Sequence, residues 1–293
     1  MTPSILKCVG RLTALIFLGE KFMNNEEWQR ISIMYTVDAF MAAQVLNSFP
    51  ALVRPIVHWF LPQCRKIREE VKLARALITP EVDRRRKELA ENAGKPRRKV
   101  LDSVDWFTAA AKGQEFDYAN AELSLAMASI HTTTNTLGFA ICDLLENQEY
   151  IPLLREEIKQ VIEEDGKWEK STLFKMKLMD SVLKESMRLH PHSLGTSPSS
   201  FVTYILMRAK STCRAKQQQT SKSLPKDAYM MVGPVLMTDP TIYPNVDKFD
   251  GHRFLKMRNA PGAENKHQFV TTTPECTVFG YGSHSCPGRF FAS

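Results

Sequence analysis

The sequence predicts a mainly α-helical protein with a minor β component. Several segments repeat apolar residues at helical spacing, and the longest, Asp117 to Asn147, has almost no charge between Glu122 and Asp143. A helix of that length would run about 46 Å, and its apolar circumference indicates that it crosses the core. One segment, Asp227 to Val235, favours a strand. Hydrophobic residues make up 43% of the 293, enough for a sizeable core.

The other predicted elements are two irregular segments and five further helices. Phe49 to Pro62 is an apolar segment interrupted by prolines, and Tyr243 to Phe254 has the irregular pattern of a meander. Pro80 is expected to break or bend the helix that contains it. Gly166 and Pro191 mark the ends of the last two helices. These further helices are predicted at Glu26 to Asn47, Arg65 to Asn92, Val104 to Ala111, Glu149 to Glu164 and Ser171 to Leu189.

No internal repeat interrupts the chain, so residues 1–293 are expected to form a single α-dominated domain. Residues 197–224 do not fit their surroundings, because they contain no acidic residue, three consecutive glutamines and many Ser, Thr, Lys and Arg. That composition is typical of a disordered insert. We interpret this segment as anomalous, the product of a retained intron or a frameshift.

The net charge of +7 comes from one stretch of the chain. Residues 65–99 hold 13 Lys or Arg and 6 Asp or Glu, which accounts for the whole excess. The basic runs at 84–87 and 95–99 lack interleaved aromatic residues and any nucleic-acid reading motif, so no nucleic-acid partner is predicted. A solvated helix face and loop is the preferred interpretation, with contact to an anionic membrane surface or an acidic redox partner as the alternative.

The N-terminal region gives no prediction of a membrane anchor or secretion signal. Its longest uncharged apolar run, Leu12 to Gly19, is too short to span a bilayer. The six cysteines at 8, 64, 142, 213, 276 and 286 show no disulfide framework. Reduced thiols in a cytosol-facing protein are therefore expected.

The last fifteen residues surround Cys286 with glycines. A thiolate that reaches a large flat cofactor from a loop needs a backbone that lies close to it, and Gly282 and Gly288 have no Cβ in the way. Cys286 is the candidate ligand for an iron held at the centre of that flat cofactor. His284, two residues before it, is expected to face a propionate group of the same cofactor. A buried free cysteine is the alternative. A zinc site is disfavoured because the chain has no C-x-x-C pair.

Two further patterns carry chemistry. The long helix contains Ala128-Ser129-Ile130-His131-Thr132-Thr133-Thr134, and a threonine cluster in mid-helix is unfavourable enough to need a reason. Core packing, with the histidine bonded to a carbonyl, is the alternative. Near Leu189 a Glu and an Arg lie at i and i+3 in Lys-Glu-Ser-Met-Arg-Leu-His-Pro, a pattern that alone indicates a surface ion pair.

Taken together, the spelling Phe-x-x-Gly-x-His-x-Cys-x-Gly resembles the haem-binding loop of the cytochrome P-450 family. The Lys-Glu-Ser-Met-Arg block resembles that family's Glu-x-x-Arg helix, and the threonine cluster resembles its oxygen-activation groove. All of them occur in the family's order. The resemblance implies an incomplete form of that fold, with a long core helix and a C-terminal cysteine loop, in which haem b is held by the axial thiolate of Cys286.

The resemblance also implies roles for single residues around the haem. Phe279, Gly282 and Gly288 would border it together with His284. In the long helix Thr132 would relay protons to dioxygen, with Thr133 as its neighbour, and His131 stands where the family usually has an acid.

A structural triad is implied as well. Glu185 and Arg188 would be buried and joined by Arg253 from Asp250-Gly251-His252-Arg253-Phe254, although Gly251-His252 departs from the family spelling. The triad would hold the fold of the cysteine loop rather than perform chemistry.

The function implied is that of a haem-thiolate monooxygenase that oxidises a lipophilic small molecule, such as a terpenoid of fungal secondary metabolism. Electrons would come from an NADPH-dependent cytochrome reductase. The family acts on the cytosolic face of the endoplasmic reticulum membrane, whereas this chain, shorter than the family at both ends and without a transmembrane segment, is expected in the cytosol. A non-catalytic truncated fragment with weak or no haem binding is the alternative. Isomerisation or dehydration without dioxygen is a third, against which Thr132 argues.

Overall fold

The computed structural model describes residues 2–91, 102–191, 207–208, 213–217, 220–224, 229–230 and 235–293. The chain divides into two compact units, Met1–Gly138 and Phe139–Ser293, and each is described by itself. Helices dominate both units, which confirms the predicted mainly α fold class. The single partial domain expected over the whole chain stays a prediction.

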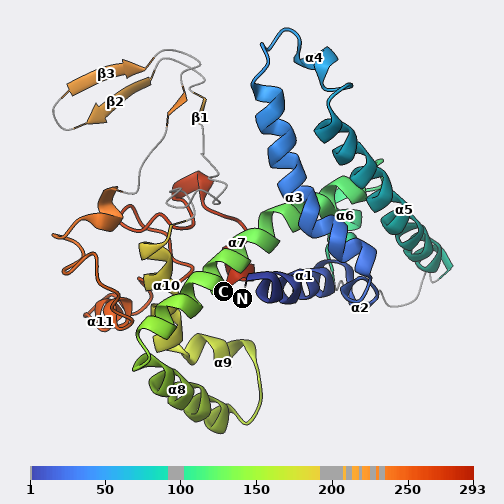
Figure 1. Ribbon diagram of the computed structural model, residues 1–293. Helices are drawn as coiled ribbons and strands as arrows, with labels where there is room; N and C mark the ends of the chain where they lie inside the picture. Colours follow the sequence, from blue (N-terminus) through green and yellow to red (C-terminus); the bar gives the residue numbers. More distant parts are fainter. Residues whose placement is uncertain are drawn as a thin grey trace. The chain divides into compact units, whose positions relative to one another are not determined.

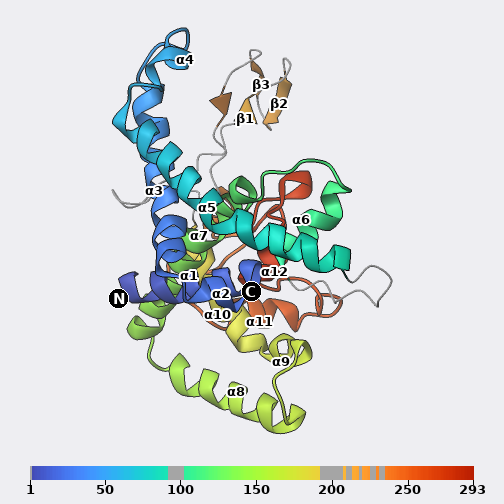
Figure 2. The same ribbon diagram turned by 90° about the vertical axis from the view of Figure 1, so that its right-hand side faces the viewer.

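The first unit is built from helices. Asn25 begins α3, because its side chain accepts a hydrogen bond from the Trp28 amide over 2.8 Å. In both views α4 lies at the end where α3 and α5 are joined (Figure 1 and Figure 2). The elements are α1 (Thr2–Leu18), α2 (Glu20–Met23), α3 (Glu26–Asn47), α4 (Arg54–Val57), α5 (Pro62–Glu91), α6 (Ser103–Ala111) and the first part of α7 (Tyr118–Glu146).

Pro80 does not end the helix that contains it. We expected a break or a bend. The break is wrong, because α5 continues as a helix through this residue for eleven further positions, to Glu91, and the bend stays a prediction. A proline inside a helix costs about 3 kcal/mol through its missing N–H and a ring clash. Ala74, Ile78 and Val82 are buried on either side of Pro80, so packing of this face offsets the cost.

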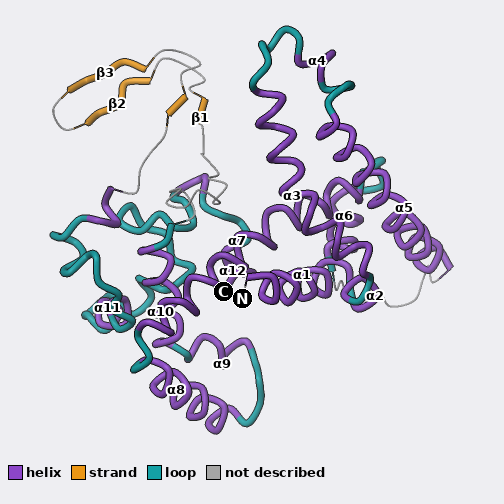
Figure 3. Tube along the Cα trace, in the orientation of Figure 1, coloured by secondary structure: helices purple, strands orange, loops and turns teal. Residues whose placement is uncertain are grey.

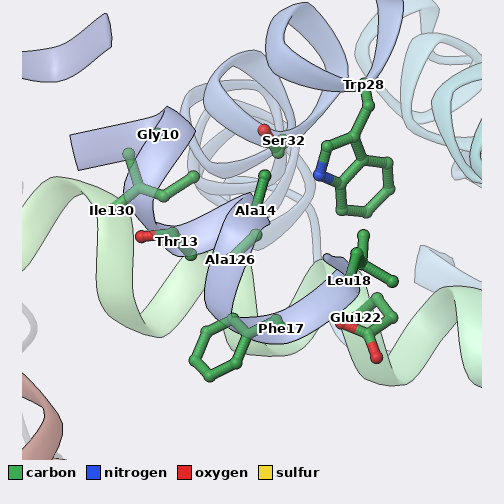
Figure 4. A pocket seen from close by; sticks show the side chains of 10 residues that line it. All are labelled: Gly10, Thr13, Ala14, Phe17, Leu18, Trp28, Ser32, Glu122, Ala126 and Ile130. Atoms are coloured by element: carbon green, nitrogen blue, oxygen red, sulfur yellow. The ribbon is translucent and has the colours of Figure 1, made fainter. Parts of the chain in front are cut away.

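The core of the first unit contains a buried carboxyl group. Glu122 of α7 is 1% exposed, and one of its oxygens is in contact with the Ser103 hydroxyl. The other oxygen, Oε2, has no hydrogen-bond partner. Beside it is a cavity of about 10 Å³, which is room for a single water molecule. Side chains of α1, α3 and α7 line this cavity, among them Ala14, Ser32 and Glu122 (Figure 4).

The second unit begins with the end of α7. The helix predicted at Ser171 to Leu189 is two helices separated at Met176, so that prediction is wrong at this point. The break has a cause in α8, because the Glu157 carboxylate accepts the amides of Leu178 (2.6 Å) and Met179 (2.9 Å) and so caps the second helix. The helices are α8 (Tyr150–Asp165), α9 (Lys170–Lys175), α10 (Lys177–Leu189), α11 (Arg253–Arg258) and α12 (Arg289–Ala292).

The described strands form two short antiparallel pairs. β1 (Met207–Arg208) pairs with β4 (Tyr229–Met230), and β2 (Cys213–Gln217) pairs with β3 (Thr220–Leu224). The strand expected at Asp227 to Val235 is represented by β4, and its positions 227–228 and 231–234 lie outside the described residues. Three of these strands fall in the segment 197–224. The rest of that segment lies outside the described residues, and its origin stays a prediction.

Loops make up most of the chain between η1 (Val235–Thr238), a short 3₁₀ helix, and the C-terminus (Figure 3). The predicted meander at Tyr243 to Phe254 consists of turns and bends until α11 begins at Arg253. A second 3₁₀ turn, η2 (Gly282–His284), lies within the cysteine loop, residues 279–288. Among the helices of the described residues, none has the length and apolarity needed to cross a membrane.

Candidate functional site

Glu185 of α10 forms the centre of a buried ion-pair group. Its side chain is fully shielded from solvent and accepts two hydrogen bonds from Arg188, from Nε over 2.8 Å and from Nη2 over 2.9 Å. Arg253 adds a third from its Nε over 2.9 Å, and the amide of Asp250 adds a fourth over 3.2 Å. This pair is therefore not the surface pair that the i, i+3 spacing alone indicates. The structure brings the three residues predicted as a triad together.

The remaining donors of both arginines bind loop carbonyls. Arg188 binds one carbonyl in η1 and one in the segment that follows it, and Arg253 closes the turn that precedes α11. One carboxylate cannot accept from all the N–H groups of two guanidinium groups. The loop carbonyls accept from the N–H groups that the carboxylate does not reach. The carbonyl acceptors belong to Met237 and Val246 for Arg188, and to Pro244, Asn245 and Lys248 for Arg253.

The cysteine loop closes on itself through its backbone. The amide of Cys286 donates to the carbonyl of Phe279 over 2.7 Å, which brings the two ends of the loop together. Gly282 has φ +65°, a conformation that favours glycine. The Phe279 side chain is buried against Met187 and Phe269 in a small core, so the loop is anchored at its first residue.

The thiol of Cys286 is exposed and free of disulfide bonding. A Cβ built on Gly288 would lie 3.9 Å from the Cys286 sulfur, which is an ordinary van der Waals contact, so Gly288 lies directly beside the thiol. The alternative of a buried free cysteine does not describe this residue. An exposed soft sulfur ligand on a glycine-framed loop fits a haem iron. The predicted propionate contact of His284 stays a prediction.

The threonine cluster of α7 lies in the first unit. Thr132 is exposed, and its hydroxyl donates to the carbonyl of Ala128 over 2.7 Å, within its own helix. Ser129 does the same to Leu125 over 2.7 Å. His131 Nε2 lies 2.9 Å from the carbonyl oxygen of Ile33 in α3, which is the carbonyl-bonded arrangement that we considered as the alternative for this histidine. The catalytic roles of Thr132, His131 and Thr133 stay predictions.

The basic run at 84–87 is largely paired with acids. Arg85 donates to both carboxylate oxygens of Asp102, over 2.7 and 2.8 Å, and to Glu81 over 3.0 Å. Arg84 bonds Glu81 and Glu88 on the same helix. These pairs support the interpretation of this run as a charged helix face. The second run, at 95–99, lies outside the described residues.

Sequence reasoning missed two polar contacts of the second unit. His190, read only as a helix terminator, stacks on Phe139 with ring centroids 4.6 Å apart and bonds Asp143 through Nε2 over 2.9 Å. Lys184, adjacent to Glu185, is completely buried. Its position directly before Glu185 is the one sequence feature that could have indicated this burial, because a lysine in a helix ordinarily lies on the solvent-exposed face. In the described residues no group of three or more His, Cys, Asp or Glu is arranged to bind a metal ion.

Comparison with known proteins places the chain in a family. The family model described as Cytochrome P450 matches residues 1–293. The chain is 40% identical to the cytochrome P450 monooxygenase adrA of Penicillium rubens, with all of this chain and 56% of that protein covered. It is 42% identical to the cytochrome P450 monooxygenase hepE of Aspergillus oryzae, with 98% of this chain and 51% of that protein covered. The chain belongs to the cytochrome P450 family.

A solved structure shows the same fold. Retinoic acid bound cyanobacterial CYP120A1 superposes with a TM-score of 0.64 and 21% identity, covering 99% of this chain and 58% of that one. The chain spans about half the length of the curated relatives it matches. Members of the family carry haem on a cysteine thiolate, receive electrons from a redox partner and act on small molecules.

Proposed function

We propose that this chain is the haem-binding and oxygen-activating part of a monooxygenase that oxidises a lipophilic small molecule, a terpenoid of fungal specialised metabolism. The observation that carries the proposal is the exposed thiol of Cys286 on a glycine-framed loop, in a chain of this family. The fungal relatives adrA and hepE are monooxygenases by name, which supports the same reaction class here.

The cysteine loop would hold haem b. Cys286 would supply the thiolate ligand, Gly282 and Gly288 would leave room for the ring, and Phe279 anchors the loop in the core of its unit. The hydrogen bond of the Cys286 amide to the Phe279 carbonyl fixes the backbone at the cysteine, whose thiol is exposed. When bound, the haem supplies dioxygen binding and activation at its iron.

Thr132 would handle the protons that dioxygen activation consumes. In the structure its Oγ1 donates its one proton to the Ala128 carbonyl, and its lone pairs are free to accept a hydrogen bond from water. To relay a proton the hydroxyl would turn from this carbonyl, donate its own proton and take one from the bound water. His131 is held by the Ile33 carbonyl and orients the helix at this point.

An NADPH-dependent cytochrome reductase would supply the electrons. The test is turnover of a panel of terpene hydrocarbons under ¹⁸O₂ with a fungal microsomal reductase and NADPH. We expect product that carries one labelled oxygen atom. Product without label would overturn the monooxygenase proposal in favour of an oxygen-independent reaction. Reductase-dependent oxygen uptake equal to that of the Cys286→Ser variant would overturn it in favour of the non-catalytic alternative.

A membrane surface is proposed as the site of action, through the segment that joins α3 to α5. Leu52, Ile56, Trp59 and Phe60 are exposed large apolar residues there. The Arg68 guanidinium lies 5.0 Å from the Trp59 ring centre, so positive charge borders the apolar residues. That combination suits an anionic bilayer surface. Trp59→Asp is expected to reduce cosedimentation with vesicles containing phosphatidylserine, and unchanged cosedimentation would contradict the contact.

A further inference from the structure

Lys184 of α10 is a fully buried lysine whose ammonium group binds the backbone of a distant loop. Its Nζ donates to the carbonyl of Gln268 over 2.5 Å and to the carbonyl of Thr271 over 2.8 Å. The side chain is 0% exposed. The ring of Phe254 also covers the ammonium group, with Nζ 5.2 Å from the ring centroid. Buried lysines are rare, and the ammonium of this one bonds two carbonyls of a single loop segment and contacts an aromatic ring of α11.

The charges around Lys184 do not form a simple ion pair. Asp180, on the preceding turn of α10, bonds Arg258 over 3.0 Å and the amide of Phe269 over 3.0 Å. Burial lowers the pKa of Lys184, and the nearby groups of Cys276 and Asp180 act in the opposite direction. Because the direct partners of the ammonium are two carbonyls rather than a carboxylate, its role is to fix the backbone of residues 268–271.

The two carbonyls flank a residue that contacts the cysteine loop. Phe269 lies between Gln268 and Thr271, and its ring meets Phe279 edge to face, with centroids 5.2 Å apart and an interplanar angle of 83°. Phe279 in turn accepts the Cys286 amide through its carbonyl over 2.7 Å. Each step of this path from Lys184 to Cys286 is a contact within the second unit. A displacement of residues 268–271 would therefore shift Phe279 and, through it, the position of Cys286.

We propose that Lys184 is a positioning residue for the Cys286 loop, acting through Gln268, Thr271 and the Phe269–Phe279 ring pair. Its effect on iron ligation rests on the proposed haem-thiolate function, whereas its effect on the loop itself does not. Glu185 and Arg188 fix the earlier loop that contains Met237 and Val246. Lys184 fixes the later one, so adjacent residues of α10 hold two different loop segments.

The test compares Lys184→Met with Leu154→Ala in the full chain. Methionine keeps the length of the side chain and removes its donors, while Leu154 belongs to a different core cluster of the same unit. The first readout is hydrogen exchange at the Cys286 amide, measured without haem. We expect at least tenfold faster exchange in Lys184→Met relative to the amides of α8, and no such local change in Leu154→Ala. Equal changes in both variants would overturn the proposal.

The second readout is the ferrous carbon monoxide spectrum of the haem-loaded chain. Lys184→Met is expected to shift part of the haem from the thiolate-ligated to the thiolate-free form, whereas Leu154→Ala leaves the ratio unchanged. If Lys184→Met does not fold, Phe269→Leu removes the ring pair and leaves the lysine contacts, and the same pattern is expected. An unmodified chain without a thiolate band contradicts the proposed function, while the exchange result still decides the role of Lys184.

Discussion

Arg253 Nε donates to Oε1 of Glu185 over 2.9 Å and so joins residues that are 68 positions apart in the chain. Because both side chains are buried and Glu185 also neutralises Arg188, removal of the carboxylate would leave two guanidinium groups buried without a counter-charge. Glu185→Gln is therefore expected to lower the free energy of unfolding by about 3 to 5 kcal/mol. Urea denaturation followed by circular dichroism measures it.

The matched control for this substitution is Glu164→Gln. Glu164 forms an exposed pair with Lys175 over 3.6 Å on the same unit, and exposed pairs contribute little to stability. No measurable change is expected. A Glu185→Gln protein as stable as this control would show that the loop carbonyls alone accommodate the arginines.

Gly251 lies where its neighbours leave no room for a side chain. A Cβ at this position would lie 2.6 Å from Cε1 of Tyr150 and 2.9 Å from Cγ2 of Val182. Gly251→Ala is expected to destabilise the protein by about 1 to 3 kcal/mol through overpacking. Gly138→Ala is the control, because no atom lies within 4 Å of the added Cβ, and in this helix alanine is expected to stabilise by about 0.5 to 1 kcal/mol. Thermal unfolding of both variants measures whether the stability falls in Gly251→Ala and rises in Gly138→Ala. A loss of stability in both variants would contradict the steric explanation.

Glu122 should make the stability of the chain depend on pH. The Ser103 hydroxyl lies within hydrogen-bond distance of both the Phe17 carbonyl oxygen, over 2.5 Å, and Oε1 of Glu122, and it has one proton for these two acceptors. Burial raises the pKa of Glu122 from 4.5 to about 8, reinforced by Asp102 and opposed by the Ser103 hydrogen bond and Arg85.

The free energy of unfolding should fall as the pH rises, because the folded chain keeps the Glu122 proton to a higher pH than the unfolded chain does. The stabilisation is fully present below pH 4.5 and is lost as the pH rises to about 8. Above that pH this group no longer changes the stability. The loss is about 5 kcal/mol at most, at 1.36 kcal/mol per pKa unit. Urea titrations at several pH values should show this slope in the unmodified chain and in a control with Glu115→Gln on an exposed loop. Glu122→Gln should reduce this slope without abolishing it, because burial also raises the pKa of Glu70 to about 7, and an unchanged slope would contradict the assignment to Glu122.

Thr132→Ala should separate proton delivery from folding. The hydroxyl is exposed and bonds carbonyls of its own helix, so stability is expected to stay the same or rise slightly. Product formation with reductase and NADPH is expected to fall by about a hundredfold or more, because proton transfer by a positioned group contributes at that scale. Thr136→Ala, which removes an equivalent bond to the Thr132 carbonyl, serves as control. Equal activity in both variants would remove Thr132 from the mechanism.

Much of the fold follows from local sequence signals. The bounds of α3 coincide with the predicted Glu26 to Asn47, because Asn25 supplies a local cap and the apolar residues recur at helical spacing. Three features did not follow. α1 was not predicted because its apolar run was weighed only as a membrane segment. The helix break at Met176 depends on Glu157 in another helix, and the continuity of α5 through Pro80 depends on packing of its neighbours.

The candidate site was predicted to a similar extent. The resemblance to the P450 family pointed to Glu185, Arg188 and Arg253, and the structure brings them together. The sequence does not reveal the carbonyls that these arginines bind, because any residue type supplies a carbonyl and only the loop path decides which one is near. Lys184 was missed for a related reason, since a lysine on an amphipathic helix is ordinarily solvent-exposed and its partners are again backbone oxygens.

The central claim is that Cys286 is the haem ligand of this chain. The most direct measurement is the absorption spectrum of the purified, haem-loaded chain after reduction under carbon monoxide. We expect the red-shifted Soret band of a thiolate-ligated ferrous complex, its retention in Cys142→Ser, which alters another exposed cysteine, and its loss in Cys286→Ser. Absence of that band from the unmodified chain, or its survival in Cys286→Ser, would contradict the claim.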